Sequence, residues 1–483
     1  MSDALYAGFG RASMWGHFPT EKTLADELDV RTLAVRGDGP PFIMAVADLG
    51  LLWPERALRI RDSVSRRTGV PVERIGIFTT QNHCAVSVNR DEFPEEALHR
   101  VFSNACDDAV KALTQVHVAR VAVRPNPALN LWRRVHVPEF GAFTFWFGYK
   151  IDGAKADVHH LVKSALRSLR DGHPYQYRCL TVKAPSDYTP PEVDWDVPSP
   201  LYAEPAPDEL VQALFFRTPA GKPVGSLLRF PTHPATANVA GHTYLSGDYP
   251  AYARRRAQAA FGGASVFMTG PCGDSCPFTG AKSLELSESL GTAIANEALK
   301  ALPRANWETS GKVDACSPEA ELLVRPDYPA SKEEAQATAD ALAAEIKAKC
   351  ATAPLPELKR LSDRYELNLY VAGRHFHNWT GLDTDNLAGK SVKTPLFGAR
   401  IGSTAIVGWP SEPFNGYSAR LRQETLGDAV ITCEEANGYL GYLPTRSEIP
   451  HGSYGINACM FAPDTEDRLI AGGKKILTEL KML

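Results

Sequence analysis

The sequence has little net charge, no long apolar run and no paired set of cysteines. The formal net charge of the 483 residues is −4, which gives no electrostatic reason to expect nucleic acid or an anionic membrane as a partner. No apolar run reaches the ~20 residues that a membrane-spanning helix needs. The first residues, MSDALYAGFGRAS, also lack the basic and long apolar stretches of a signal peptide. We therefore expect a cytoplasmic protein that acts on a small-molecule substrate, and the sequence leaves its oligomeric state open.

The cysteines are nine in number and scattered along the chain. An odd, scattered set argues against a disulfide framework and suits a reducing compartment. Cys272 and Cys276 stand close together in PCGDSCP, but a structural zinc ribbon needs a second such pair, which the sequence does not contain. We therefore expect free thiols.

Apolar runs that resemble strands alternate with helical patterns, which predicts an α/β fold with mixed sheets flanked by helices. The helical patterns include 54–69 and 95–113, and a further helix is expected within 327–350, where Ser331 and Glu334 have capping-box spacing. The strand-like runs are 41–53, 74–80, 118–125, 176–184, 224–233, 264–270, 403–410 and 429–438. No linker separates these runs convincingly, so we expect one domain over 1–483 with a helical insertion at about 327–365.

Polar side chains follow five of the strand-like runs, where α/β proteins often place ligand and catalytic groups. The five stretches are TTQNHCA, FPTHPAT with LSGDYP, TGPCGDSCP, GWPSEPF, and EEANGYLGYLPTRSEIPHGSYG. Proline after His233 ends strand pairing there and lets the imidazole be presented. Ordinary structural roles remain open for each residue: a capped strand end for Gln81 and His83, a helix cap for Glu412, and packing for the tyrosines.

A separate candidate metal pair lies in GRHFHNW. His375 and His377 would share one face if this segment were a strand. No acidic residue stands near them in the sequence, so this pair is the weaker candidate.

The five stretches, in this order, resemble the neutral/alkaline ceramidase family of zinc amidases. The resemblance extends over about 5–130, 225–290 and 400–460, and VRPNPALNL is similar to the family's Asn-Arg-Ser-Pro stretch. It implies the family's catalytic-domain fold, a hydrolase activity and a bound zinc ion. Secreted ceramidases carry a leader and a C-terminal β-sandwich domain, neither of which we expect here, so the implied substrate is a smaller soluble amide or ester.

The resemblance also implies roles for individual residues. His233, Glu412 and Tyr442 match three of the family's four zinc ligands. Arg124 and Tyr454 match the residues that contact the reacting amide. The resemblance further implies that His83 faces the substrate. It also implies that the substrate site is lined by Gln81, Asp274, Cys276 and Tyr439.

Two positions differ from the family pattern within the same site. Gln81 stands where the family has its first histidine ligand, and Cys276 stands where the family has serine. A neutral amide oxygen is a poor zinc ligand beside an imidazole nitrogen. Our first hypothesis is therefore a zinc-assisted amide or ester hydrolase, with His83 as a possible substitute ligand.

Two alternatives stay open at this stage. The same residues could form a metal-independent acid–base site for a glycosidic or lactone bond, which full activity after chelation would favour. The chain could also bind a ligand without turning it over, which any turnover lost on Glu412→Gln would contradict.

Overall fold

The computed structural model describes residues 4–18, 20–87, 94–126, 129–145, 155–174, 207–239, 241–277 and 282–483. The strand-like run at 176–184 lies outside these residues. Each of the other seven runs contains a strand, and mixed sheets with flanking helices confirm the expected α/β class.

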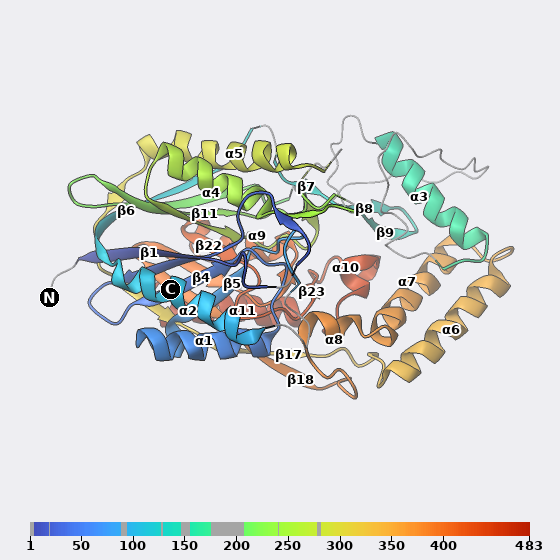
Figure 1. Cartoon of the computed structure of the whole chain (residues 1–483). Coiled ribbons are helices and arrows are strands. Elements are labelled where there is room, and N and C mark those ends of the chain that lie inside the picture. Colours follow the sequence, from blue (N-terminus) through green and yellow to red (C-terminus); the bar gives the residue numbers. More distant parts are fainter. Residues whose placement is uncertain are drawn as a thin grey trace.

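The larger sheet has nine strands and a mixed topology (Figure 1). Its order is β13 (Ala264–Thr269), β11 (Pro223–Phe230), β10 (Val211–Arg217), β6 (Thr114–Val123), β1 (Leu5–Ser13), β3 (Asp29–Arg36), β4 (Phe42–Ala47) and β5 (Ile75–Thr79), with β15 (Trp307–Glu308) paired to β6. Only the terminal pairs β11–β13 and β4–β5 are parallel, and the strands between them are antiparallel.

A smaller sheet of four strands packs face to face against the first. Its order is β16 (Val313–Cys316), β19 (Phe397–Ile401), β20 (Thr404–Gly408) and β22 (Val430–Cys433), with β20 and β22 parallel. Side chains alternate along β4: Met44 and Val46 enter the core between the sheets, where Phe397 and Ile406 meet them, while Ala45 faces the opposite layer. Two-residue periodicity thus gives the large sheet two buried faces.

Helices cover the outer faces of both sheets. The large sheet is covered by α1 (Pro54–Thr68) and α2 (Glu95–Lys111) at one end, and by α4 (Asp248–Ala260) and α5 (Leu284–Ala301) at the other (Figure 1). The small sheet is covered by α9 (Asn415–Gln423) and α11 (Thr465–Glu479). The helices expected at 54–69 and 95–113 are therefore confirmed within two residues.

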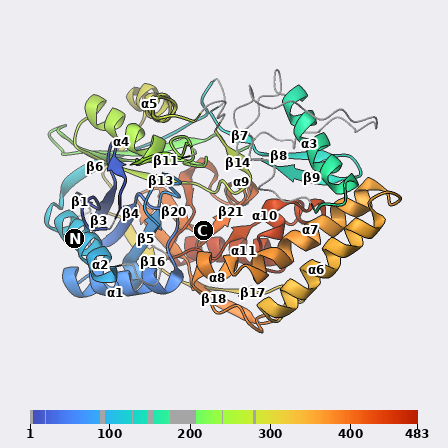
Figure 2. The same cartoon turned by 45° about the vertical axis from the view of Figure 1, so that its right-hand side comes forward.

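A helical unit stands to one side of the sheets (Figure 2). It contains α3 (Lys155–Arg170), α6 (Lys332–Lys349), α7 (Leu355–Ala372), and the hairpin of β8 (Arg134–Val137) and β9 (Gly141–Thr144), which share one apolar cluster. The expected cap is present, because Ser331 Oγ accepts a hydrogen bond from Glu334 N at 3.2 Å. Helices α6 and α7 thus occupy the segment where the insertion was expected, whereas the single-domain interpretation stays a prediction.

The expected strand at GRHFHNW is wrong. Residues His375–Thr380 form the short helix α8, which follows α7 after a left-handed residue at Arg374, with φ 55°. Positions two apart on a helix point in different directions. His377 Nδ1 instead bonds Leu382 O at 2.9 Å, and His375 packs edge-on against Tyr370.

The remaining strands form two-stranded pairs around the site and the helical unit. They are β2 (Thr23–Leu24) with β12 (Tyr244–Leu245), β7 (Leu131–Trp132) with β14 (Ser275–Cys276), β17 (Glu319–Leu323) with β18 (Ser391–Pro395), and β21 (Glu412–Pro413) with β23 (Tyr442–Leu443). The short helix α10 (Tyr454–Asn457) follows. Within the described ranges every cysteine is a free thiol, as expected, and no helix combines the length and apolar character needed to cross a membrane.

Candidate active site

The carboxyl ends of five strands from both sheets meet in the interior. Each is followed within a few residues by polar side chains that the sequence had singled out. The strands and their last residues are β5 (Thr79), β11 (Phe230), β13 (Thr269), β20 (Gly408) and β22 (Cys433). The site therefore combines segments that are far apart in the sequence.

Hydrogen bonds to backbone carbonyl groups hold these strand ends together. Thr269 Oγ1 donates to Thr80 O at 2.8 Å, and Glu434 N donates to Thr269 O at 3.1 Å, which joins the ends of β5, β13 and β22. His83 N donates to Pro234 O at 3.0 Å and joins the loop after β5 to the loop after β11. The side chains that follow are therefore fixed relative to one another.

His233 and Glu412 form the centre of the site. His233 Nε2 and Glu412 Oε1 lie 2.8 Å apart, and both side chains are almost completely buried. The contact is close, yet neither atom makes a hydrogen bond of acceptable geometry. His233 Nδ1 donates to Ser275 O at 2.8 Å, and Glu412 Oε2 accepts from Tyr439 OH at 3.0 Å. Each group is thus held at one end and presents its other end to a common point.

A buried arginine lies against this pair. Arg133 Nη2 is 3.6 Å from Glu412 Oε1 and donates to Tyr442 OH at 3.0 Å. The guanidinium is fixed by two further hydrogen bonds to Gly273 O, at 3.1 and 2.7 Å. The ring of Tyr454 packs edge-on against Tyr442 with 5.0 Å between centroids. The arrangement places one permanent positive charge and two phenols beside the carboxylate.

Electrostatics at His233 favour the charged ring. Burial lowers the pKa of His233, and Arg133 adds to that effect, but Cys276 and Glu412 outweigh both and raise this pKa to about 10. For Cys276, burial raises the pKa, but the neighbouring His233 outweighs it and the net pKa is lowered. The thiol, imidazole and carboxylate thus interact as one coupled group.

His83 lies beside His233 and is partly exposed. The two rings stack with centroids 5.7 Å apart and an interplanar angle of 30°. Burial, together with the positive charges of His233 and Lys282, holds the pKa of His83 well below its usual range. His83 is therefore neutral at pH 7.

The side-chain oxygen of Gln81 is hydrogen-bonded to a neighbouring thiol. Its Oε1 accepts from Cys272 Sγ at 3.1 Å, and Cys272 also contacts Glu434 Oε1 at 3.1 Å. Gln81 Nε2 is buried and makes no hydrogen bond. Burial raises the pKa of Glu434 to about 8, and Glu412 adds to the rise, so Glu434 holds a proton at neutral pH.

Three residues at these strand ends adopt left-handed backbone conformations. They are Gln81 (φ 60°), Ser411 (φ 77°) and Glu435 (φ 52°), which follow β5, β20 and β22. Non-glycine residues adopt this region rarely, and such strain clusters at functional sites. The surrounding hydrogen bonds keep the side chains in place despite this cost.

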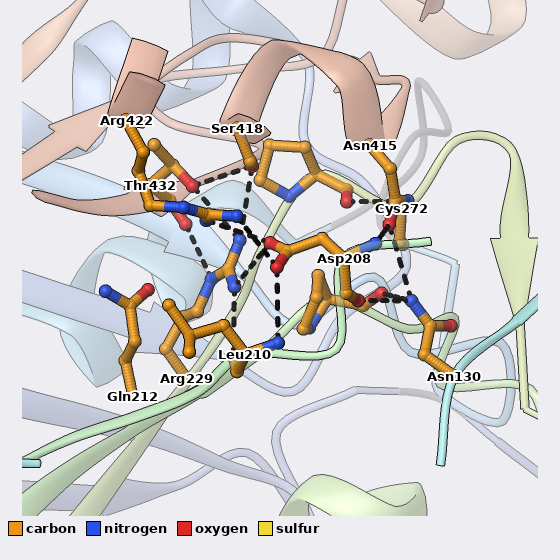
Figure 3. Close-up of polar contacts among 12 residues, drawn as sticks. Asn130, Asp208, Leu210, Gln212, Arg229, Cys272, Asn415, Ser418, Arg422 and Thr432 are labelled. Atoms are coloured by element: carbon orange, nitrogen blue, oxygen red, sulfur yellow. Dashed lines mark hydrogen bonds and ion pairs between the residues drawn. The ribbon is translucent and has the colours of Figure 1, made fainter. Parts of the chain in front are cut away.

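Asn415 ties the turn after β13 to the rest of the interior (Figure 3). Its Nδ2 donates to Asp274 Oδ1 at 3.0 Å and to Ser275 Oγ at 2.8 Å, and its backbone N donates to Asp274 Oδ1 at 2.8 Å. Its Oδ1 accepts from Asp208 N at 2.7 Å. Because Ser275 O holds the His233 ring, Asn415 fixes that ring through the turn.

Asp208 continues into a buried ion-pair network (Figure 3). Its carboxylate accepts from Arg229 Nη1 at 2.9 Å and from both terminal nitrogens of Arg422 at 2.9 and 3.0 Å. Arg229 also donates to Ser418 Oγ and Thr432 Oγ1, at 3.2 and 3.0 Å. We call these five residues the Asp208 network.

The structure brings together most of the residues expected from the sequence. Arg124 is not among them: it follows β6, its side chain is exposed, and its described electrostatic neighbour is Glu209. Arg133 lies in the cluster instead. Asp274 accepts two hydrogen bonds from Asn415, so it positions the turn after β13. The residues gathered around the His233–Glu412 pair are Gln81, His83, Cys276, Tyr439, Tyr442 and Tyr454.

Four site residues were missed by sequence reasoning: Arg133, Asn415, Glu434 and Glu435. Glu434 and Glu435 directly follow β22, so the rule that identified Glu412 could have identified them. Asn415 lies three residues after Glu412. Arg133 lies between two short strands in LWRRVHV, where nothing in the local pattern distinguishes it from Arg134.

Two buried donors at this site, one imidazole nitrogen and one carboxylate oxygen, are of the kinds that bind zinc. His233 Nε2 and Glu412 Oε1 are buried, lack hydrogen bonds and face a common point, and the Ser275 carbonyl orients the imidazole in the way that supporting groups orient metal-bound histidines. With Tyr442 they would supply three protein ligands and leave one position open. His, Cys, Asp and Glu alone form no metal-binding group of three among the described residues, so Tyr442 is needed for the set.

No protein-family model and no curated protein sequence matches the chain. Solved structures do match. A neutral ceramidase from Pseudomonas aeruginosa superimposes with a TM-score of 0.65 over 100% of this chain and 75% of that one, at 14% sequence identity. A ceramidase complexed with C2 gives a TM-score of 0.64 over 99% of this chain and 75% of that one, also at 14% identity. The chain therefore has a neutral ceramidase-like fold, as its motifs indicated.

Proposed function

We propose that this chain is a hydrolase that cleaves an amide or ester bond of a small soluble substrate, with a zinc ion at His233, Glu412 and Tyr442. The observation that carries the proposal is the His233–Glu412 pair, whose two facing atoms lie 2.8 Å apart without a hydrogen bond. The ceramidase-like fold supports the same class of reaction.

A bound zinc ion would polarise a carbonyl group and lower the pKa of a bound water. The chain's own residues do the rest. Arg133 and Tyr454 stand beside the pair and donate hydrogen bonds to the oxygen of the acyl group as negative charge develops there. His83, whose ring stacks on His233, is placed to take the proton that the attacking water loses. Tyr439 keeps Glu412 in position through its hydrogen bond to Oε2.

A second candidate uses the same residues without a metal. Arg133, buried 3.6 Å from Glu412 Oε1, already supplies a positive charge beside the carboxylate. With His83 as base, that charge would support acid–base cleavage of a glycosidic or lactone bond. A third possibility, ligand binding without turnover, stays a prediction that the same experiment tests.

Metal content and activity of matched variants distinguish these candidates. Protein purified without chelators and without a metal-carrying tag is analysed by elemental mass spectrometry, then tested on a panel of amides, esters, lactones and glycosides. We expect about one zinc per chain in the wild type, and loss of both zinc and turnover in Glu412→Gln. The control is Glu424→Gln, which removes a carboxylate from the exposed end of α9 and should change neither.

Other results would select another candidate. Full turnover after exhaustive chelation would contradict the zinc mechanism and favour metal-free acid–base chemistry. Wild-type protein that binds zinc and turns over no substrate class would leave ligand binding as the function.

A further inference from the structure

Glu435 is a buried carboxyl group without a protein partner. Its side chain is 2% exposed, and neither Oε1 nor Oε2 makes a hydrogen bond within the described part of the chain. Its neighbour Glu434 is equally buried but accepts from Cys272 N and Sγ, both at 3.1 Å. Buried polar groups in native proteins nearly always have partners, so an orphaned carboxyl group needs an explanation.

Glu435 lies in the candidate active site. It follows β22 directly, and its backbone N donates to Ser411 O at 2.9 Å, which places it beside the residue before Glu412. Burial raises the pKa of Glu435, and the charges of Glu434 and Glu412 add to the rise. The charge of Glu435 in turn acts on Tyr439, the phenol bonded to Glu412.

The cations of this site, Arg133 and the charged ring of His233, both lie at Glu412 Oε1, and neither forms an ion pair with Glu435. Arg133 donates hydrogen bonds to Gly273 O and Tyr442 OH and forms an ion pair with Glu412 Oε1. Neither Glu434 nor Glu435 forms an ion pair with any lysine, arginine or histidine that the structure describes. The missing partner must therefore donate hydrogen bonds, and a positively charged donor would also offset the burial and keep the carboxyl group ionised.

We propose that Glu435 binds a free amino group of the substrate, so that the substrate is an amide or ester that also carries a primary amine. This substrate assignment rests on the proposed function. An ammonium group supplies three donors and one charge, which match a carboxylate with two open oxygens. A metal ion fits less well, because no three His, Cys, Asp or Glu residues in the described chain converge on one point.

The test measures ligand binding through protein stability and does not require catalytic turnover. Melting temperature is measured for wild type, Glu435→Gln and the control Glu424→Gln at rising concentrations of propylammonium chloride, with 1-propanol and sodium chloride as matched additives. We expect propylammonium to raise the melting temperature of the wild type and the control along a saturating curve. The shift should fall at least fivefold in Glu435→Gln, and 1-propanol should give none.

Each contrary result would overturn the proposal. These results are equal shifts with 1-propanol, no propylammonium shift in the wild type, or a shift that persists in Glu435→Gln. A shift with magnesium or calcium chloride that depends on Glu435, without one for propylammonium, would assign a metal ion instead. Glu435→Met provides a second variant of similar length should the glutamine protein fail to fold.

Failure of this proposal and failure of the proposed function can be told apart. Amine binding that depends on Glu435 in a protein without acyl hydrolysis would overturn the hydrolase and leave the amine site standing. Hydrolysis that depends on Glu412, without amine binding, would do the reverse.

Discussion

Two buried polar regions lie side by side in this molecule, and they differ in how completely their atoms are paired. In the Asp208 network, the two arginines and the carboxylate bond one another, Ser418 and Thr432, and none of the five residues leaves a buried side-chain nitrogen or oxygen without a hydrogen bond (Figure 3). In the candidate active site, His233 Nε2 and Glu412 Oε1 contact each other as an ion pair without a well-formed hydrogen bond, and both oxygens of Glu435 lack hydrogen bonds.

This difference distinguishes buried polar residues that stabilise the fold from those that bind a ligand. A complete network stabilises the fold and needs nothing from outside, whereas an incomplete one destabilises the empty protein and is completed by a ligand. Asn415 belongs to both regions, because it bonds Asp208 on one side and the turn that holds His233 on the other. Mutations in the two regions should therefore separate activity from stability.

The largest effect is expected for His233→Ala in the site. Turnover should fall at least a thousandfold, which corresponds to about 4 kcal/mol of transition-state stabilisation. The free energy of unfolding should fall by less than that, about 1 to 3 kcal/mol, because Glu412 loses a buried partner but keeps Arg133 at 3.6 Å. Turnover assays and urea unfolding measure the two quantities. His242→Ala on the same loop is the control, and a loss of stability larger than the loss of activity would contradict the comparison.

The next largest effect is expected for Asp208→Asn in the network. Breaking a buried charge pair leaves Arg229 and Arg422 uncompensated and should cost about 3 to 5 kcal/mol of unfolding free energy. Asp171→Asn, which removes an exposed partner of Arg167, should cost less than about 1 kcal/mol. Urea unfolding at pH 7 compares the variants, and equal losses would show that the network contributes little.

The free energy of unfolding should also fall at acidic pH, because Asp208 becomes protonated. Burial raises the pKa of Asp208, but Arg229 and Arg422 outweigh it and lower the pKa to about 2. A depressed folded-state pKa gives stability that is complete above the unfolded-state value and is lost as the pH falls towards 2. Asp208 should thus contribute about 2 kcal/mol to the loss between pH 5 and pH 2. Asp208→Asn should flatten unfolding free energy in that range, and an unchanged pH dependence would contradict the assignment.

A smaller and mixed effect is expected for Asn415→Ala. Turnover should fall about 10- to 100-fold, because the turn no longer fixes the imidazole. Stability should fall by about 1 to 3 kcal/mol, since Asp274 loses its donors. Ser418→Ala, on the same helix but without contact to the turn, should lose comparable stability and keep turnover within a few-fold. The ¹⁵N spectrum of His233 reports the protonation and hydrogen bonding of its ring nitrogens, and a spectrum unchanged in Asn415→Ala would argue against the positioning role.

The smallest effect is expected for Glu435→Gln, and its sign is opposite. Removing an ionisable group that the empty protein cannot pair should raise the free energy of unfolding at pH 8 by about 1 kcal/mol. The raised pKa of Glu435 gives the sign, because a folded state that holds the proton more tightly loses stability as the pH rises. The gain should therefore be smaller at pH 5. Destabilisation at pH 8 would mean that Glu435 has a structural partner.

Much of the fold could be predicted because each part has a local cause. Continuous apolar runs predicted β4 and β5, and the spacing of Ser331 and Glu334 predicted the start of α6. The rule that strand ends carry ligand and catalytic groups pointed to His233 and Glu412, which the structure places 2.8 Å apart, and to Gln81, which bonds Cys272. The segment at His375 failed because two aromatic residues and two histidines suggest a strand, whereas packing against Tyr370 and the end of α7 imposes a helix.

The rest of the site depends on tertiary contacts that no local pattern records. Arg124 and Arg133 both follow β6, and only the bonds from Arg133 to Gly273 and Tyr442 decide which guanidinium enters the interior. Likewise, Glu434 and Glu435 are adjacent and chemically identical. One finds Cys272 as a partner and the other finds none, a difference that follows from backbone direction alone.

The scattering of the site along the chain also determines when function can first appear. The contributing segments begin at Gln81 and end at Tyr454, so no shorter nascent chain holds the complete set. At about 5 to 20 residues per second, a ribosome needs roughly 20 to 90 s to reach Tyr454. Until then the strand ends of the amino-terminal half carry buried-type polar groups without their partners. Such a protein depends on remaining soluble during translation, and a truncated product would be inactive even if its first sheet had formed.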